Sequence, residues 1–394
     1  KLVHGLERDL FVYADVPYRI KPYRDLVRNP RDTVEYDDGH ARTVAGRVAS
    51  MGTDGRLVTL PNGSIYRVNL LEKLLLVALV RIGNLVPGGG IWMNTQRPEW
   101  NDANNALVGY GLSMVTLCYL RRYLHLLDDV LGESRAADFS VSDELAELYH
   151  GVRQVLDDHG NLLEGSAGGA VRKSFMDRIG AVNDRFRARV YGGLRGDRTR
   201  LAKQELQEFT RLAMKFLDHT IAHARRADGL FHSYNLVRFG DDGYDVEPLD
   251  EMLEGQVAVL SSGHLTPQDA MSLLEALRAS RLYREDQNSY LLYPNRELPS
   301  FLDKNRIPEQ AVQASPWLRA ELDAGRTRYV QQDLGGQVHF NAVFRNGDCL
   351  RAALDQDPAV DRQDRDRLCD LYEQVFRHHS FTGRSGSMYK YEGL

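Results

Sequence analysis

Residues 69–90 read NLLEKLLLVALVRIGNLVPGGG, a strongly apolar run that closes on a proline and three glycines. Asn69 and Glu72 have the spacing of a helix N-cap and its reciprocal partner, which predicts a helix over 70–82 that the proline and glycines end. A second apolar segment, 106–127, also shows helical spacing. Two long apolar helices on either side of one loop favour a mainly α protein.

Helical periodicity continues along the rest of the chain, with glycine-bearing or aromatic loops between the helices. The further predicted helices cover 141–157, 171–193, 200–226, 248–261, 267–280, 316–324, 348–356 and 360–379. The loops recur at intervals typical of an array of helical hairpins, without a fixed-period repeat. We therefore expect an (α/α)6 toroid of helical hairpins that occupies 69–394 as one domain and is truncated at its C-terminus.

Residues 1–68 have a different pattern and are predicted to form a linker segment and a small β meander. Short β-prone runs such as Thr43–Ala45 alternate here with Asp38-Gly39, Asp54-Gly55 and Asn62-Gly63. These dipeptides readily adopt the positive φ of tight hairpin turns. A small antiparallel β element is therefore expected near the N-terminus.

Composition limits the classes of function. Lys and Arg number 50 against 55 Asp and Glu, and no Lys/Arg-rich run indicates a nucleic-acid surface. The longest apolar run, Leu74–Val80, is far shorter than the ~20 residues of a membrane span. The three cysteines lie far apart, which is typical of neither a disulfide framework nor a zinc site. We expect a cytoplasmic protein that has no nucleic-acid or membrane partner and that can form a homodimer.

The loop between the two apolar helices, 88–105, reads GGGIWMNTQRPEWNDANN and has the composition of a sugar site. Indole rings stack on the C–H faces of sugars, and amide, guanidinium and carboxylate groups bond their hydroxyls. Asp102, beside an indole, can stay protonated and act as a general acid, or it can simply cap the following helix. The other residues of this loop expected to bind substrate are Trp92, Arg97, Trp100 and Asn101.

A later loop, 281–296, alternates aromatic and hydrogen-bonding side chains and is predicted to line a saccharide groove, or else to be a structured inter-helix loop. Its expected substrate-binding residues are Tyr283, Gln287, Tyr290 and Tyr293. Glu254 and Asp286 are candidate bases that would activate water in a hydrolase. No metal site is predicted, because the His219/His223 pair lacks the intervening glutamate of the metalloprotease motif.

Residues 99–105, EWNDANN, resemble the Asp-Trp-Asn-Asp-Gly-type motif of glycoside hydrolase family 94, which contains the cellobiose, chitobiose and 1,2-β-oligoglucan phosphorylases. The resemblance implies that Asp102 protonates the glycosidic oxygen. Glu99 and Ala103 depart from the Asp and Gly that are usual in the family.

Two downstream segments extend the resemblance. Residues 338–344 are similar to the family's segment with a phosphate-binding His, and 378–387 are similar to its Thr-Gly phosphate loop. The implied phosphate-binding residues are His339, Thr382, Gly383, Arg384 and Ser385.

The resemblance implies a catalytic domain that performs inverting phosphorolysis of β-linked gluco-oligosaccharides. Inorganic phosphate would be a co-substrate and the nucleophile, and no cofactor is expected. Two alternatives stay open. One is an inverting hydrolase whose carboxylate base lies about 6.5–9.5 Å from Asp102, and the other is a non-catalytic saccharide-binding toroid.

Overall fold

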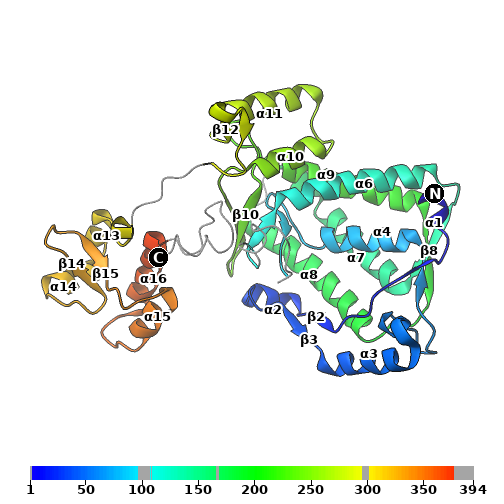
Figure 1. Ribbon diagram of the computed structural model, residues 1–394, viewed down its shortest axis with the longest axis horizontal. Coiled ribbons are helices and arrows are strands. Elements are labelled where there is room, and N and C mark those ends of the chain that lie inside the picture. The colour runs from blue at the N-terminus through cyan, green and yellow to red at the C-terminus, as the bar shows by residue number, and fades with distance from the viewer. Residues whose placement is uncertain (1, 96–106, 108, 166–167, 295–300, 377–394) are drawn as a thin grey trace. The chain divides into compact units, whose positions relative to one another are not determined.

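The protein is mainly α-helical with small antiparallel sheets, and it divides into two compact units (Figure 1). The computed structural model describes residues 2–95, 107, 109–165, 168–294 and 301–376. The described residues up to Pro294 belong to the first unit, and 301–376 belong to the second. Each unit has its own hydrophobic core.

The helices of the first unit pack around one apolar core. They are α1 (Leu2–Gly5), α2 (Tyr23–Arg28), α3 (Asp38–Met51), α4 (Leu70–Ile82), α6 (Met114–Glu133), α7 (Asp143–Asp158), α8 (Gly169–Tyr191), α9 (Lys203–His223), α10 (Leu253–Ser261) and α11 (Pro267–Ala279). Short 3-10 turns cover Gly52–Arg56, Gly160–Glu164 and Glu285–Gln287. Helix α6 packs against α9, α10 and α4, and α7 packs against α8 and α4.

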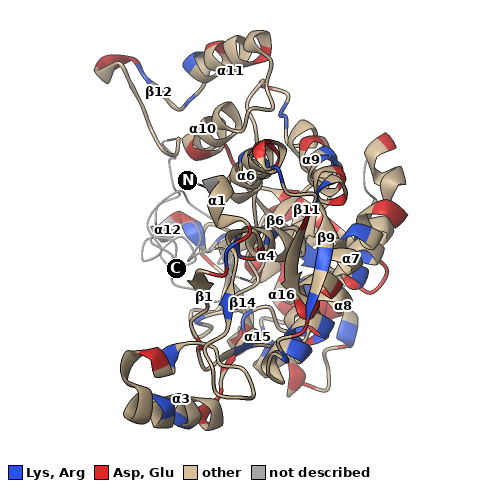
Figure 2. Ribbon diagram, turned by 90° about the vertical axis from the view of Figure 1, so that its right-hand side faces the viewer, with Lys and Arg blue, Asp and Glu red and all other residues tan. Residues whose placement is uncertain are grey.

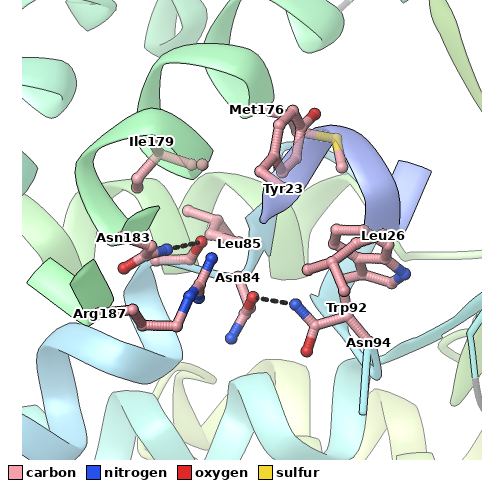
Figure 3. Close-up of a pocket in the computed structure, with 12 residues that line it drawn as sticks. Tyr23, Leu26, Asn84, Leu85, Trp92, Asn94, Met176, Ile179, Asn183 and Arg187 are labelled. Carbon is pink, nitrogen blue, oxygen red and sulfur yellow. Dashed lines mark hydrogen bonds between the residues drawn. The ribbon is translucent and has the colours of Figure 1, made fainter. Parts of the chain in front are cut away.

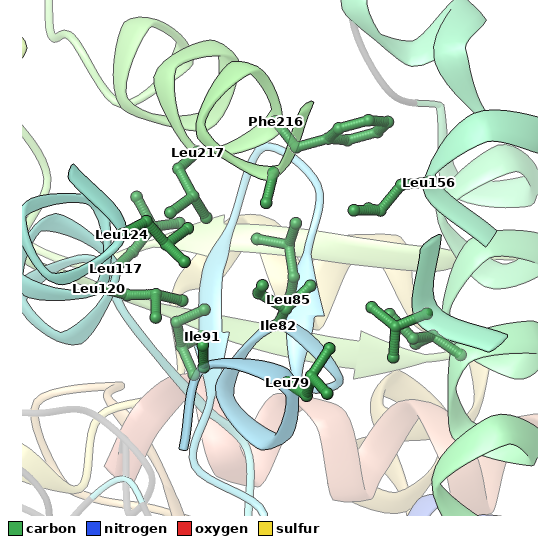
Figure 4. Close-up of a cluster of buried hydrophobic side chains, with 14 of the residues drawn as sticks. Leu79, Ile82, Leu85, Ile91, Leu117, Leu120, Leu124, Leu156, Phe216 and Leu217 are labelled. Carbon is green, nitrogen blue, oxygen red and sulfur yellow. The ribbon is translucent and has the colours of Figure 1, made fainter. Parts of the chain in front are cut away.

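Side chains from α4, α6, α7 and α9 converge in this core together with Leu85 and Ile91 of the neighbouring strands (Figure 4). Each fully buried leucine or phenylalanine stabilises the fold by about 1.5–3 kcal/mol relative to its exposed state. The helical part of the sequence prediction is confirmed for the long apolar segments. The closed ring of six hairpins is not established by these contacts and stays a prediction.

The start of α4 shows how local sequence sets a helix boundary. Asn69 Oδ1 accepts a hydrogen bond from the backbone N–H of Glu72 at 2.9 Å, as the sequence predicts. The Glu72 carboxylate instead accepts hydrogen bonds from Tyr66 Oη and Ser142 Oγ, both at 2.9 Å. Glu72 therefore joins α4 to two other segments of the unit.

A five-stranded antiparallel sheet lies among these helices, in the order β11–β10–β7–β6–β5. Its strands are β5 (Leu85–Val86), β6 (Gly90–Trp92), β7 (Gly111–Ser113), β10 (Tyr234–Phe239) and β11 (Tyr244–Pro248). The helix predicted from 106 begins at Met114, because β7 precedes it and Ser113 caps it by accepting from Thr116 N at 2.9 Å. The helix predicted from 248 likewise begins at Leu253, after β11.

The N-terminal β element is present, but it is smaller than predicted. β1 (Phe11–Val12) pairs with β4 (Arg67–Val68), β2 (Tyr18–Ile20) pairs with β3 (Val34–Tyr36), and elsewhere β8 (Asp138–Ser142) pairs with β9 (Arg198–Ala202). The strands predicted over 43–48 are wrong, because these residues lie in α3, whose N-cap Asp37 accepts from His40 N at 2.8 Å. The turn at Asn62-Gly63 is confirmed, with Gly63 at φ +81°.

The described part of the second unit is built from helices of 4 to 15 residues and one β-hairpin. Its elements are α12 (Phe301–Lys304), α13 (Glu309–Ala314), α14 (Pro316–Asp323), β14 (Val330–Gln332), β15 (Val338–Phe340), α15 (Gly347–Asp355) and α16 (Arg362–Phe376). Phe340, Leu350, Leu368 and Tyr372 are central to its core. Because this core is separate, the region predicted as one domain over 69–394 contains two units that meet in sequence near residue 295.

Charged residues of both signs are interspersed along the helices, as α3 and α9 show in Figure 2. Cross-helix ion pairs such as Arg153–Glu208, at 3.2 Å, join α7 to α9. Partly exposed pairs of this kind contribute only about 0–1 kcal/mol each, so the apolar core supplies most of the stability. Among the described helices, none is long and apolar enough to cross a membrane.

Candidate functional site

The structure describes both ends of the segment that carries Asp102. β6 leads into it and β7 follows it, with Ile91 paired to Ser113 and Trp92 paired to Leu112. Beyond these pairs, Met93 N donates to Gly111 O at 2.9 Å. The connection therefore begins and ends at the same end of two neighbouring inner strands of the sheet.

A second set of hydrogen bonds joins the two ends of this connection. Gly109 N donates to Met93 O at 2.8 Å, and Trp92 Nε1 donates to Gly109 O at 2.9 Å. Gly109 has φ +93°, and a Cβ there would lie 2.3 Å from Pro30 O, so this position requires glycine. We call residues 90–95 and 109–113 the loop stem.

Trp92 itself does not present a free ring face to a sugar. Its side chain is buried at 3% exposure, and its ring packs edge-on against Tyr23 and Phe239 at centroid distances of 6.3 and 5.2 Å. The prediction of a substrate-binding role for Trp92 is thus not supported by its position. Its indole stabilises the loop stem instead.

A small pocket borders the loop stem (Figure 3). Asn94 Nδ2 donates to Asn84 Oδ1 at 2.7 Å, and Asn183 Nδ2 donates to Gly83 O at 2.8 Å. The pocket volume is about 10 Å³, which is room for at most about one water molecule. The described residues around the stem therefore hold the two ends of the connection but do not themselves enclose a sugar.

Most residues of the predicted acid and phosphate sites lie outside the described residues. These are Arg97, Trp100, Asn101, Asp102, Thr382, Gly383, Arg384 and Ser385. Their roles stay predictions.

The aromatic loop predicted to line a groove is a β-hairpin of β12 (Tyr283–Arg284) and β13 (Ser289–Tyr290). Tyr283 and Tyr290 are opposite each other with ring centroids 5.3 Å apart, and Tyr283 Oη donates to Asn288 Oδ1 at 2.9 Å. Gln287 lies in the 3-10 turn that joins the strands. The hairpin presents Tyr290 at the surface, 38% exposed, where a ring can contact a ligand.

The same hairpin lies against the start of α10. Leu253 N donates to Leu292 O at 3.0 Å, next to the predicted substrate-binding residue Tyr293. Glu254, one of the two candidate bases, follows Leu253 and accepts from Tyr234 Oη at 3.1 Å. The structure therefore brings Glu254 close to the aromatic hairpin.

The backbone of Tyr234 pairs with Ser113, at the end of β7 away from the connection that carries Asp102. Glu254 is therefore linked, through Tyr234, to the end of β7 that lies away from the connection.

Asp286, the other candidate base, is ion-paired within its own turn. Arg284 Nε and Nη2 donate to its two carboxylate oxygens at 2.8 and 2.6 Å. These hydrogen bonds, together with the positive charge of Arg284, hold the pKa of Asp286 below its usual range. With both oxygens engaged, Asp286 is poorly arranged to take a proton from water.

His339 belongs to β15 of the second unit, and both of its ring nitrogens have partners. Nδ1 donates to the carbonyl oxygen of Asn305, and Nε2 lies 3.1 Å from Asp333 Oδ2. The hydrogen bond from His339 also lowers the pKa of Asp333. This geometry explains His339 as a link within the second unit, and a phosphate-binding role would require one of these bonds to break.

Sequence reasoning missed two asparagines, one in the loop stem and one beside it. Asn84 follows the C-terminus of α4, and Asn94 follows β6. An asparagine directly after a predicted helix commonly bonds nearby backbone, and Asn84 Nδ2 does donate to Val80 O at 3.0 Å. Among the described residues, no cluster of His, Cys, Asp and Glu could hold a metal ion.

Comparison with known families finds one similarity, and it lies in the C-terminal part of the chain. Residues 298–379 match the family model described as GH149 phosphorylase insertion domain 2. The matched region contains all the described elements of the second unit, including His339. No curated protein matches the chain significantly.

Proposed function

We propose that the chain is part of a glycoside phosphorylase that cleaves β-linked gluco-oligosaccharides with inversion. The match of 298–379 to a phosphorylase insertion domain is the observation that carries this proposal, and it supports the enzyme class. The resemblance of EWNDANN to the family 94 motif supports Asp102 as the acid. The hydrogen bonds of the loop stem fix the two ends of the segment that contains Asp102, and this also supports the proposal.

In the proposed reaction, Asp102 donates its proton to the glycosidic oxygen as the bond from that oxygen to the anomeric carbon breaks. A phosphate oxygen attacks the anomeric carbon from the opposite face, so the products are a sugar 1-phosphate of inverted configuration and a shortened oligosaccharide. Arg97, Trp100 and Asn101 bind the sugar. Thr382, Gly383, Arg384 and Ser385 surround the phosphate with hydroxyl, backbone N–H and guanidinium donors.

The test is product analysis with short β-glucan oligosaccharides, in the presence and absence of inorganic phosphate. A sugar 1-phosphate that forms only with phosphate supports the proposal. Free sugar that forms equally in both conditions makes the protein a hydrolase, and no turnover in either leaves only saccharide binding.

Substitution of the acid sharpens this test. Asp102→Asn is expected to lower kcat by about 10²–10⁴-fold, the range of a lost general acid. Asp129→Asn is the matched control, because Asp129 is an exposed carboxylate on α6. Unchanged turnover in Asp102→Asn would show that another group supplies the proton.

A further inference from the structure

The first unit contains a second pocket, which is much larger than the one beside the loop stem. Its volume is about 370 Å³, within the ~300–1,000 Å³ typical of small-molecule sites. The N-terminal segment and helices α3, α4, α7 and α8 all contribute to its lining, and all of its lining residues belong to the first unit. We call it the N-terminal pocket.

The N-terminal pocket lies between two separate hydrophobic clusters. One wall belongs to the main core of the unit and comes from Leu76, Leu145 and Phe186. The other wall belongs to a small second cluster and comes from Tyr13, Val58, Tyr66, Val190 and Leu194. Most of these side chains are only half-buried, so they keep apolar surface that is accessible from the pocket. An apolar ligand would remove that surface from water and join the two clusters, which is favourable.

The charged side chains of the lining already have partners of opposite charge. The pairs are Asp15–Arg47, Arg19–Asp37, Glu72–Arg198 and Glu144–Arg189. A charged ligand would have to compete with these pairs and would lose its own hydration when it enters the pocket. The lining therefore disfavours both anions and cations.

The other polar groups of the lining do not select a polar ligand either. The hydroxyls of Tyr66 and Ser142 donate to Glu72, and Thr59 Oγ1 accepts from Arg47 Nη1 at 2.7 Å. Three polar atoms of lining residues have no hydrogen-bond partner among the described residues, but they are buried away from the pocket surface and cannot meet a ligand. They are Tyr13 Oη, Arg47 Nε and Glu144 Oε2.

Aromatic rings line the pocket on several sides and favour an aromatic ligand over an alkyl chain. Tyr13 and Tyr66 are stacked with ring centroids 6.4 Å apart, and Phe186 and Tyr191 come from α8. Tyr18 also lines the pocket and is 58% exposed. Pairs of aromatic rings attract each other beyond the effect of the area that they bury. Since an apolar cavity of about 150 Å³ holds one benzene, the N-terminal pocket has room for two fused rings.

We propose that the N-terminal pocket binds a neutral aromatic molecule of about two fused rings. The ring system lies between Leu76 and Phe186 on one side and Val58 and Val190 on the other, and so connects the two clusters. The proposal rests on the lining of the pocket and does not depend on phosphorolysis.

The test is calorimetric titration of the protein with indole, a neutral molecule of two fused rings, and with n-hexanol as an alkyl probe. Saturable binding of indole with a Kd below about 1 mM is expected. Binding of n-hexanol is expected to be at least tenfold weaker, because an alkyl chain lacks the ring–ring attraction.

Val190→Phe tests whether indole binds in this pocket. The added ring occupies part of the empty apolar space, so the variant is expected to weaken indole binding at least tenfold and to keep or raise the Tm of the unliganded protein. Val171→Phe is the matched control, because it makes the same change at an exposed position of the same helix, α8, and should bind indole like the unaltered protein.

Phe186→Leu tests the preference for an aromatic ligand. It keeps an apolar side chain in the wall but removes a ring, so indole binding is expected to weaken threefold to tenfold while n-hexanol binding changes less than twofold. A general loss of stability would weaken the binding of both probes equally, so the ratio of the two affinities isolates the contribution of the ring.

Three results would overturn the proposal. They are no saturable binding of indole up to 10 mM, binding of n-hexanol as tight as that of indole, and indole binding that Val190→Phe leaves unchanged. A failed phosphorolysis assay together with indole binding that Val190→Phe weakens would reject the proposed function alone and leave this site standing.

Discussion

Trp92→Phe tests whether the loop stem depends on one buried indole. Phenylalanine keeps an aromatic ring against Tyr23 and Phe239, but it cannot donate to the Gly109 carbonyl, which the native indole contacts at 2.9 Å. The substitution therefore removes one hydrogen bond between the two ends of the stem and leaves most of the ring packing.

The size of the effect follows from the burial of both partners. Trp92 is 3% exposed and Gly109 is also buried, so water cannot replace the lost donor without entering the core. An unsatisfied buried carbonyl costs about 1–3 kcal/mol. The smaller ring leaves a void that adds about 1 kcal/mol. The expected loss in the free energy of unfolding of the first unit is therefore about 2–4 kcal/mol.

The assay is urea unfolding followed by far-UV circular dichroism, with separate transitions fitted for the two units. Trp317→Phe is the matched control, because Trp317 packs against Tyr329 in the second unit and should shift only that unit's transition. A change below about 0.5 kcal/mol for Trp92→Phe would refute the reasoning, since a surface substitution has that size.

Two further predictions concern single groups in the first unit. Burial alone would raise the pKa of Asp218, but hydrogen bonds from His264 and Arg121 outweigh it and hold the pKa below its usual value. The stability from this carboxylate is thus present above about pH 4 and lost as the pH falls further, so Asp218→Asn should cost about 1.5–3 kcal/mol at pH 7 and progressively less below pH 4 in urea titrations. Burial raises the pKa of Cys118 to about 12, whereas Cys349 is exposed, so a thiol reagent at pH 8 should label Cys349 and spare Cys118 in the native protein; equal labelling rates would contradict this.

The long helices could be predicted from the sequence because each buries a stripe of apolar residues that repeats over many turns. The pattern over 70–82 coincides with α4, and Thr266 with Pro267 marks the start of α11. The strands of the sheet in the first unit were missed because three of them are only two or three residues long, too short for alternation to be visible. Residues 38–51 form a helix rather than a hairpin because Asp37 caps the N-terminus of that helix. The Asp-Gly dipeptide alone does not distinguish a helix start from a hairpin turn.

The candidate site was only partly predictable, because residue type does not determine which face of a side chain is free. Trp92 is the residue type expected to stack on a sugar ring, yet tertiary packing covers its own ring. The proximity of Glu254 to the aromatic hairpin depends on a backbone hydrogen bond between Leu253 and Leu292, which no local pattern encodes. His339 was selected by resemblance, and its two hydrogen-bonding partners come from elsewhere in the second unit.

The loop stem also bears on how the proposed specificity could be changed. Its hydrogen bonds fix the separation of the two chain ends at Met93 and Gly109, so the entropy of closing the intervening connection is offset by contacts that lie outside it. Under the proposed function, substitutions at 96–106 are expected to alter substrate preference without disturbing the register of β6 and β7. The proposed chemistry and the scaffold that supports it would then belong to different residues, which would make this segment a favourable target for directed evolution.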